Sequence, residues 1–184
     1  HPRAPIVFTV SSSGILESEI KKWGGKPIME KVGHSFVEHA MEEHGALLGG
    51  EQSGHFFCFE NYFHFDDAMV AACHVLKILS KASSPLSTLF NQFPKVFQSP
   101  EVRPRCLDEH KTRIVRSVTE HFAKTYPVNT LDGARIDFGD SAWASVRQSN
   151  TSPCLSVCIE ARTPEKLQEV EKAVWEHLKT HPEI

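Results

Sequence analysis

The chain has 184 residues, of which 40% are hydrophobic and 23% are charged, the composition of an ordinary globular protein. At roughly 100–200 residues per domain, this length allows one domain or two small ones. Lys and Arg number 20 against 23 Asp and Glu, so the net charge of -3 lacks the basic excess of a general nucleic-acid binder. No apolar run approaches the ~18 residues of a membrane span, which argues against an integral membrane protein.

The five cysteines are odd in number and lack CxxC spacing. This pattern is typical of reduced, mostly buried thiols in a cytosolic protein. The chain opens at His1 with neither an initiator Met nor a signal segment. We therefore expect a fragment of a longer cytoplasmic protein.

The first half of the chain alternates predicted strands and helices. Compact β-branched and apolar runs predict strands, and apolar residues at helical spacing between glycines predict helices. In chain order we expect a strand 6–10, a helix 15–23, a strand 27–29, a helix 35–44, a strand 46–48, a strand 56–59, a helix capped by Asp66 or Asp67 with apolar positions 69, 72, 73, 76 and 79, and a short helix from Ser84-Pro85. This order predicts a three-layer α/β domain with a mostly parallel or mixed sheet.

The second half begins after a change in composition. Pro94, Pro100 and Pro104 interrupt the segment 92–104, and no helical period survives there, so we place a hinge near residue 98. Beyond it we expect a helix 108–124, strands 134–138, 143–146 and 155–160, and a helix from Thr163-Pro164. This order predicts a two-layer α+β domain with an antiparallel sheet, and hence separate domains over residues 1–97 and 98–184.

The segment 49–55, GGEQSGH, sets polar side chains between three glycines after a predicted strand. Glycines let the backbone approach a ligand, and the Glu51 carboxylate and Ser53 hydroxyl suit the hydroxyls of a sugar. His34 precedes a predicted helix, where an anion is favoured and an imidazole can pass a proton. The alternatives are a glycine-rich turn without a ligand and a histidine that only caps the helix.

The segment 147–153, RQSNTSP, is expected at a turn between two strands. Arg147 offers a planar fork that matches phosphate oxygens, and Ser149, Asn150 and Thr151 add neutral donors. The segment lacks the spacing and the Lys of a Walker phosphate loop. Its alternative is a polar hairpin without a ligand, since these residue types favour turns.

We expect no metal site in this chain. His34, His39 and His44 recur every five residues and so do not share one helical face for zinc. No Asp-x-Asp-x-Asp run or similar acidic cluster offers a magnesium site.

Taken together, in this order and at this separation, the two segments resemble loops of the α-D-phosphohexomutase family. GEQSGH (50–55) is similar to the sugar-binding loop of that family's third domain, and RQSNTSP (147–153) to the phosphate-binding loop of its fourth. The resemblance covers nearly the whole chain. It implies the C-terminal half, domains three and four, of a four-domain enzyme.

The resemblance also implies an activity. Such enzymes interconvert hexose 6-phosphates and hexose 1-phosphates through a phosphoserine and a bisphosphorylated intermediate, with a hexose bisphosphate as activator. The phosphoserine loop and the Mg2+ loop belong to the first two domains, so this half alone is expected to be inactive. The implied partners are hexose phosphates and the missing N-terminal domains, with no nucleic acid and no membrane. The implied site residues are Glu51 and Ser53 for the sugar, His34 and His55 as candidate catalytic residues in the cleft, and Arg147, Ser149, Asn150 and Thr151 for the phosphate that is not transferred.

Three departures from the family pattern leave alternatives open. Many members carry a Lys just after the first strand of domain three, where this chain has serines at 11–13. The family's Asp-Gly-Trp appears here as the sequence DSAW (140–143), and Gln148 replaces a common Pro or Ala. The serines support one alternative, a non-catalytic sugar-phosphate-binding protein with a decayed site. Another, two α/β domains without a ligand, would require both loop matches to be accidental.

Overall fold

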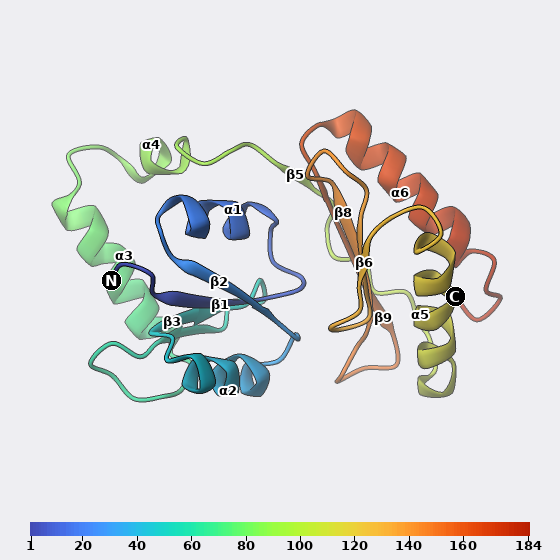
Figure 1. Cartoon of the computed structure of the whole chain (residues 1–184), viewed down its shortest axis with the longest axis horizontal. Helices are drawn as coiled ribbons and strands as arrows, with labels where there is room; N and C mark the ends of the chain where they lie inside the picture. The colour runs from blue at the N-terminus through green and yellow to red at the C-terminus, as the bar shows by residue number, and fades with distance from the viewer. The chain divides into compact units, whose positions relative to one another are not determined.

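The computed structural model describes all residues from His1 to Ile184. It divides into two compact units, His1–Lys95 and Val96–Ile184, each with a sheet of its own (Figure 1). The sequence-based boundary lies two residues later, between residues 97 and 98. None of the helices combines the length and apolarity needed to cross a membrane.

Unit 1 is built on a four-stranded mixed sheet. Its elements are β1 (Pro5–Thr9), α1 (Ile15–Lys22), β2 (Lys26–Glu30), α2 (His34–His44), β3 (Leu48–Gly50), β4 (Phe56–Cys58), α3 (Ala68–Lys81) and α4 (Leu86–Phe90). The strand order is β2-β1-β3-β4, with β1 parallel to β2 and β3, and β3 antiparallel to β4. Helices α1 and α2 lie on opposite faces of this sheet (Figure 1), which confirms the predicted three-layer α/β arrangement.

The core of unit 1 lies between the sheet and α2. Val7, Gly49 and Phe57 stand side by side in register on three neighbouring strands, so they share one face of the sheet. A Cβ on Gly49 would overlap Met41 Sδ and lie 3.1 Å from Val37 Cγ1 of α2. The sequence suggested that the glycines let the backbone approach a ligand. Gly49 instead allows the close approach of α2 to the sheet.

Helix α3 begins as predicted, since the Asp67 side chain accepts hydrogen bonds from the backbone N–H groups of Met69 and Val70. None of its residues is buried, however, and Met69 and Leu76 are 75% and 64% exposed. A mostly apolar hollow of about 720 Å³ is lined by residues of α3 and of the sheet, with Ile6 and Leu48 on the sheet side. The helical spacing of apolar residues therefore predicted the helix but not its exposure.

The third strand lies two residues later than expected. Gly45 ends α2 in the left-handed conformation, with φ of 64°. The backbone N–H of Ala46 still donates to Met41 O of the helix at 2.8 Å, so Ala46 belongs to the cap. The strand therefore starts at Leu48 and includes the glycine pair instead of the predicted residues 46–48.

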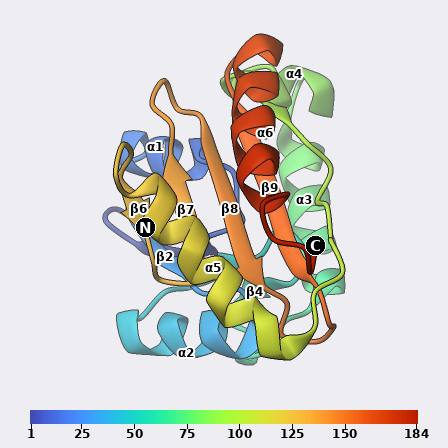
Figure 2. The ribbon, with the colours of Figure 1, turned by 90° about the vertical axis from the view of Figure 1, so that its right-hand side faces the viewer.

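Unit 2 is a two-layer α+β domain with a wholly antiparallel sheet, as predicted. Its elements are β5 (Phe97–Gln98), α5 (Asp108–Phe122), β6 (Val128–Asn129), β7 (Ala134–Asp137), β8 (Trp143–Gln148), β9 (Leu155–Ala161) and α6 (Pro164–Leu178). The strand order is β5-β9-β8-β7-β6. Both helices cover the same face of the sheet (Figure 2).

The proline-rich segment forms an edge of this sheet. Gln98 pairs with β9, and two further bridges join Val102 to Val157 and Arg105 to Cys154. Proline is tolerated on an edge strand because the N–H that it lacks would face solvent. Residue 98 therefore lies in a paired edge strand of unit 2, where the sequence analysis expected a hinge.

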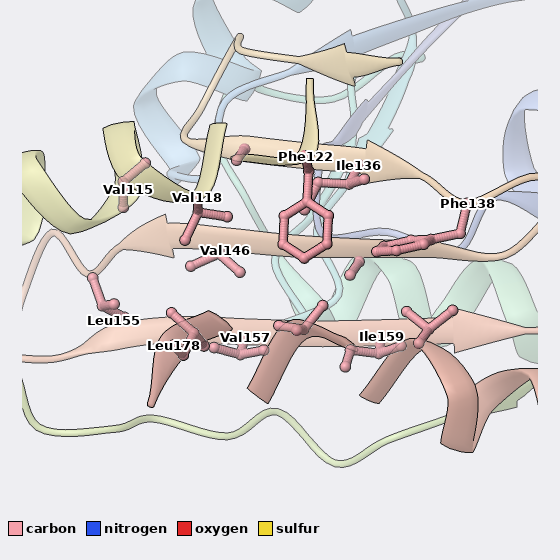
Figure 3. Packing of buried hydrophobic residues seen from close by; sticks show 14 of the residues in the cluster. Val115, Val118, Phe122, Ile136, Phe138, Val146, Leu155, Val157, Ile159 and Leu178 are labelled. Atoms are coloured by element: carbon pink, nitrogen blue, oxygen red, sulfur yellow. The ribbon is translucent and has the colours of Figure 1, made fainter. Parts of the chain in front are cut away.

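The core of unit 2 lies between the sheet and its two helices (Figure 3). Alternate residues of β7, β8 and β9 point toward the helices, and Val146 of β8 is one of them. The next residue, Arg147, consequently projects from the opposite face of the sheet. Other members of the core that Figure 3 labels are Val115, Val118, Phe122, Ile136, Phe138, Leu155, Val157, Ile159 and Leu178.

Candidate functional site

The first candidate loop connects β3 to β4. The backbone N–H of Glu51 donates to His55 O at 2.9 Å, and that of Gly54 donates to Glu51 O at 3.1 Å. Gly54 has a φ of 95°, a conformation that suits glycine. These bonds fold the loop back on itself and leave Ser53 exposed at its tip.

Glu51 is buried at the base of this loop, 6% exposed. Its Oε2 accepts a hydrogen bond of 3.0 Å from the backbone N–H of Gly33, which precedes α2. Its Oε1 is buried and has no hydrogen-bond partner within the chain. A buried carboxylate oxygen without a donor is costly, so this atom can accept a hydrogen bond from a ligand.

Two histidines lie beside Glu51. His34 is the first residue of α2, and the centroids of the His34 and His55 rings are 5.9 Å apart. The His55 Nδ1 forms a short contact with Asp66 Oδ2. The structure thus brings Glu51, His34 and His55 together. Sequence reasoning missed Asp66, which it considered only as a helix cap.

Asp67 takes the capping role instead. A hydrogen bond from the Tyr62 hydroxyl and two from backbone N–H groups at the start of α3 lower the pKa of Asp67 below its usual value. The Asp67 carboxylate therefore serves as the cap of α3, and the Asp66 carboxylate takes no part in that cap.

The second candidate loop follows β8 in unit 2. Arg147 lies inside the strand and not in the turn, because β8 continues to Gln148, two residues beyond its predicted end. Its side chain is 7% exposed, and its Nε donates to Asp132 Oδ2 at 3.1 Å. A guanidinium has five N–H donors, so an ion pair through Nε fixes its plane without using the whole fork.

The turn itself is held by Ser149. Its Oγ accepts hydrogen bonds from the backbone N–H groups of Ser152 at 3.2 Å and Thr151 at 3.4 Å. Asn150 and Thr151 are exposed. The loop borders a hollow of about 370 Å³ that also includes Asp108 and Lys111 at the start of α5, but Arg147 is not among its lining residues.

Lys111 anchors this loop and was missed by sequence reasoning. It is 4% exposed, and its Nζ donates to Ser149 O at 3.0 Å and to Ser152 O at 2.6 Å. Its third partner is Asp108 Oδ1, at 2.6 Å. A Lys in the first turn of an amphipathic helix ordinarily faces solvent, so the sequence carried no signal of this role.

The chain holds no group of three or more His, Cys, Asp or Glu side chains that could bind a metal ion. The chain offers two candidate loops, one in each unit. The first offers a buried carboxylate oxygen and two imidazoles, and the second a guanidinium, two hydroxyls and an amide.

Comparisons with known proteins give a consistent result. Residues 1–97 match the family described as "Phosphoglucomutase/phosphomannomutase, alpha/beta/alpha domain III", and residues 101–177 match "Phosphoglucomutase/phosphomannomutase, C-terminal domain". The chain is 36% identical over 180 residues to a phosphomannomutase/phosphoglucomutase of Pseudomonas aeruginosa, covering 97% of this chain but 39% of that relative.

Solved structures agree with these matches. A phosphoglucomutase/phosphomannomutase family protein from Burkholderia thailandensis superposes with a TM-score of 0.85 at 31% identity, over 97% of this chain and 38% of that one. An N-acetylphosphoglucosamine mutase from Aspergillus fumigatus, solved with GlcNAc-6P and magnesium, shares the fold with a TM-score of 0.68 at 13% identity, over 96% of this chain and 41% of that one.

Proposed function

This chain belongs to the phosphoglucomutase/phosphomannomutase family, and from that premise we propose that it is the ligand-recognising C-terminal half of a phosphohexomutase. The whole protein would interconvert hexose 6-phosphates and hexose 1-phosphates through a phosphoserine and a bisphosphorylated intermediate. The chain spans 39% of the length of its Pseudomonas aeruginosa relative, so the reaction depends on further domains.

The observation that carries the proposal is the unpartnered oxygen of Glu51. Oε1 is buried in a loop whose backbone is already satisfied, and the side chain is held by the Gly33 N–H through its other oxygen. A sugar hydroxyl would supply the missing donor to Glu51 Oε1. Its own oxygen could at the same time accept a hydrogen bond from the Ser53 hydroxyl. His34 and His55 beside this carboxylate would bind the sugar phosphate and hold or pass a proton.

The loop of unit 2 would bind the phosphate that is not transferred. Arg147 is held in one plane by Asp132, and a guanidinium stays charged at every working pH. Ser149, Asn150 and Thr151 follow it within four residues, and Lys111 fixes the backbone that carries them. Such a charged and prepositioned group suits a phosphate dianion.

Mg2+ is the metal expected for the whole enzyme, where it would stabilise charge during phosphoryl transfer. The residues of this chain do not fit it, since no cluster of acidic or other ligating side chains is present. A metal site would have to come from outside these residues, as would the phosphoserine. We therefore expect no mutase turnover by the 184-residue chain with glucose 1-phosphate or mannose 1-phosphate, magnesium and a hexose bisphosphate.

Isothermal titration of glucose 1,6-bisphosphate into the chain tests the proposal. Glu51→Gln removes the charge that a sugar hydroxyl would meet, so the affinity is expected to fall by about tenfold or more, the value of one charge-assisted hydrogen bond. Glu43→Gln, at an exposed position of α2, is the matched control and should bind like the parent chain. Equal affinity of the Glu51→Gln variant and the parent would overturn the sugar-loop assignment.

The non-catalytic binding protein remains the alternative, supported by the serines that follow β1 in place of a Lys. It predicts the same titration result. The two proposals differ in the intact protein, which would bind hexose phosphates without converting them if the site has decayed.

A further inference from the structure

We infer that Lys111 is a positioning residue: from the first turn of α5, its ammonium holds the loop 149–153 in the conformation that receives a phosphate, without contacting the phosphate itself. The inference deepens the proposed function and rests on it for the identity of the ligand. It starts from the hydrogen bonds that Lys111 Nζ donates to Ser149 O at 3.0 Å and to Ser152 O at 2.6 Å.

Lys111 occupies a position of α5 that faces the core. It is 4% exposed and is the only charged member of the buried stripe of this helix. Lysine is almost never fully buried unless its charge is paired, because taking an ammonium out of water is costly. An apolar side chain would complete the stripe without that cost, so the contacts of the ammonium have to account for the lysine. The buried residues follow the spacing of one helical face: Lys111, Ile114, Val115, Val118 and Phe122.

The donors of the ammonium are all used within the chain. An ammonium has three N–H groups and no acceptor. Two of them meet the carbonyls of Ser149 and Ser152, and the third meets Asp108 Oδ1 at 2.6 Å. None is left for a phosphate oxygen. Lys111 therefore acts on a ligand through the loop, which distinguishes its role from the one proposed for Arg147.

These bonds orient the peptide groups at both ends of the loop. In a trans peptide unit the C=O and N–H groups point in opposite directions, and the chain has no cis peptide bond. The Ser149 carbonyl points to the ammonium on α5, so the N–H of Asn150 points away from it. At the other end, the Ser152 carbonyl points to the same ammonium and precedes Pro153, which has no N–H.

The middle of the loop is ordered from within. Ser149 Oγ accepts the N–H groups of Ser152 at 3.2 Å and Thr151 at 3.4 Å. Carbonyl oxygens would repel an anion, and two of those in the loop are turned toward the helix by Lys111. Asn150 and Thr151 are left as the exposed tip. The loop thus presents its polar side chains to solvent, with these two carbonyls directed away from the approach of a phosphate.

Helix α5 contacts the loop at two adjacent residues. Next to Lys111, the Thr112 hydroxyl donates to Gln148 Oε1 at 3.4 Å. The hollow of about 370 Å³ at this junction is lined by Asp108, Lys111 and the loop residues themselves. A loop that is ordered before its ligand arrives loses less conformational entropy on binding, so the anchor is expected to raise the phosphate affinity.

The first measurement needs only the parent chain. In the 15N-labelled 184-residue chain at about pH 7, we expect a resolved signal from the Lys111 ammonium, because hydrogen bonding and burial slow the exchange of its protons. The Lys172 side chain on α6 is 76% exposed, so its ammonium should give no such signal. The Lys111→Met variant identifies the resonance. Exchange at Lys111 as fast as at Lys172 would overturn the inference.

The second measurement concerns the order of the loop without ligand. Lys111→Met keeps an unbranched apolar side chain in the buried stripe but removes the three donors. Backbone 15N relaxation should then show larger motion on the ps–ns timescale at Asn150 and Thr151. The turn 139–142, at the opposite end of β8, is the internal control and should be unchanged. Unchanged motion at the loop, or an equal increase in both turns, would overturn the inference.

Isothermal titration of glucose 1,6-bisphosphate measures the consequence for binding. The affinity of Lys111→Met is expected to fall by about tenfold or more, the equivalent of one charge-assisted hydrogen bond. Lys111→Arg keeps the charge and can donate to two carbonyls, so it should recover part of both the affinity and the loop order. Lys172→Met is the matched control on the other helix of the unit and should bind like the parent chain.

The two readouts separate this inference from the proposed function. A loosened loop in Lys111→Met with the affinity of the parent chain would overturn the positioning role. A parent chain that fails to bind the bisphosphate, while its loop still depends on Lys111, would overturn the proposed function and leave the ordering of the loop by Lys111 standing.

Discussion

Among single residues, Arg147 is expected to provide the largest share of phosphate affinity. It is a buried guanidinium held in its plane by Asp132, and it offers parallel donors that an ammonium lacks. Replacing it with Ala should weaken binding of glucose 1,6-bisphosphate by about 1.5–3 kcal/mol, or roughly 10- to 150-fold. Arg147→Lys should recover only part of this loss, and titration calorimetry on the folded variants measures both effects.

Arg116 offers the control for that series. It lies in the same unit, on α5, where it is exposed and pairs with Glu120 on its own helix. Arg116→Ala should bind the bisphosphate like the parent chain. If Arg147→Ala also bound unchanged, the guanidinium would be no more than a structural partner of Asp132, and the phosphate-loop assignment would fail.

A second residue-scale prediction concerns Gly133, which follows Asp132. Its φ is +80°, and a Cβ there would lie 2.5 Å from Val146 O and 2.8 Å from Arg147 Cα. Gly139 has nearly the same φ, +77°, with nothing within 4 Å of its would-be Cβ. Gly139→Ala should therefore lower the free energy of unfolding by about 1–2 kcal/mol through strain alone. Gly133→Ala should lower it by about a further 1–3 kcal/mol, and equal losses in urea unfolding would refute the close approach.

The candidate residues could be predicted from the sequence, but their partners could not. Short-range motifs identified Glu51, His55 and Arg147, because glycines and clustered polar side chains are visible in a few adjacent letters. Asp66 and Lys111 act through contacts eleven and about forty residues away. Such contacts depend on strand bridging and helix packing, which no local pattern records.

At the scale of elements, α3 is expected to be the least protected of the long helices. This helix has no buried residue, and it borders an apolar hollow beside the sheet. Its backbone hydrogen bonds therefore receive little protection from packing. Protection against exchange follows burial and packing, so its amides should exchange faster than those of α6, which buries Val170, Val174 and Leu178. Amide exchange followed by mass spectrometry measures this, and equal protection of α3 and α6 would contradict it.

The long helices were predictable because their signals are local. Asp67 and Thr163 accept the hydrogen bonds of the first turns of α3 and α6, and Gly45 ends α2. The strands β5 and β6 were not predicted. Each has only two residues and exists because a neighbouring strand pairs with it, which the sequence of the short segment does not reveal.

For the whole molecule, the two cores predict unequal stabilities. Seven buried residues form the cluster of unit 1 and eighteen form that of unit 2, and buried apolar area is the main stabilising term. Unit 1 should therefore unfold at a lower urea concentration than unit 2. Trp23 reports on unit 1, while Trp143 and Trp175 report on unit 2. The Trp143→Phe/Trp175→Phe variant keeps only the reporter of unit 1, and the Trp23→Phe variant keeps only those of unit 2. Their fluorescence should give distinct urea midpoints, and coincident midpoints would show one cooperative structure.

Unit 2 also contains three neighbouring histidines. The rings of His121 and His177 stack with centroids 4.1 Å apart, and those of His177 and His181 are 5.5 Å apart. Burial, followed by the positive charges of His121, His181 and Lys124, lowers the pKa of His177 below its usual value, while a hydrogen bond with Ser117 acts in the opposite direction. The folded state therefore resists protonation at this site.

The last prediction is that acid weakens unit 2 through this cluster. Because the pKa of His177 is lower in the folded than in the unfolded state, the unfolded chain binds more protons just below about pH 6.5, the ordinary pKa of histidine. The stabilisation is fully present above that pH and is lost as the pH falls toward the lower folded-state pKa. The urea midpoint of unit 2, followed by Trp175 fluorescence, should therefore fall between about pH 7.5 and pH 5.5. His177→Gln should flatten this dependence. His110→Gln, on α5 and outside the cluster, should not change it. An unchanged slope in His177→Gln would exclude the cluster as its source.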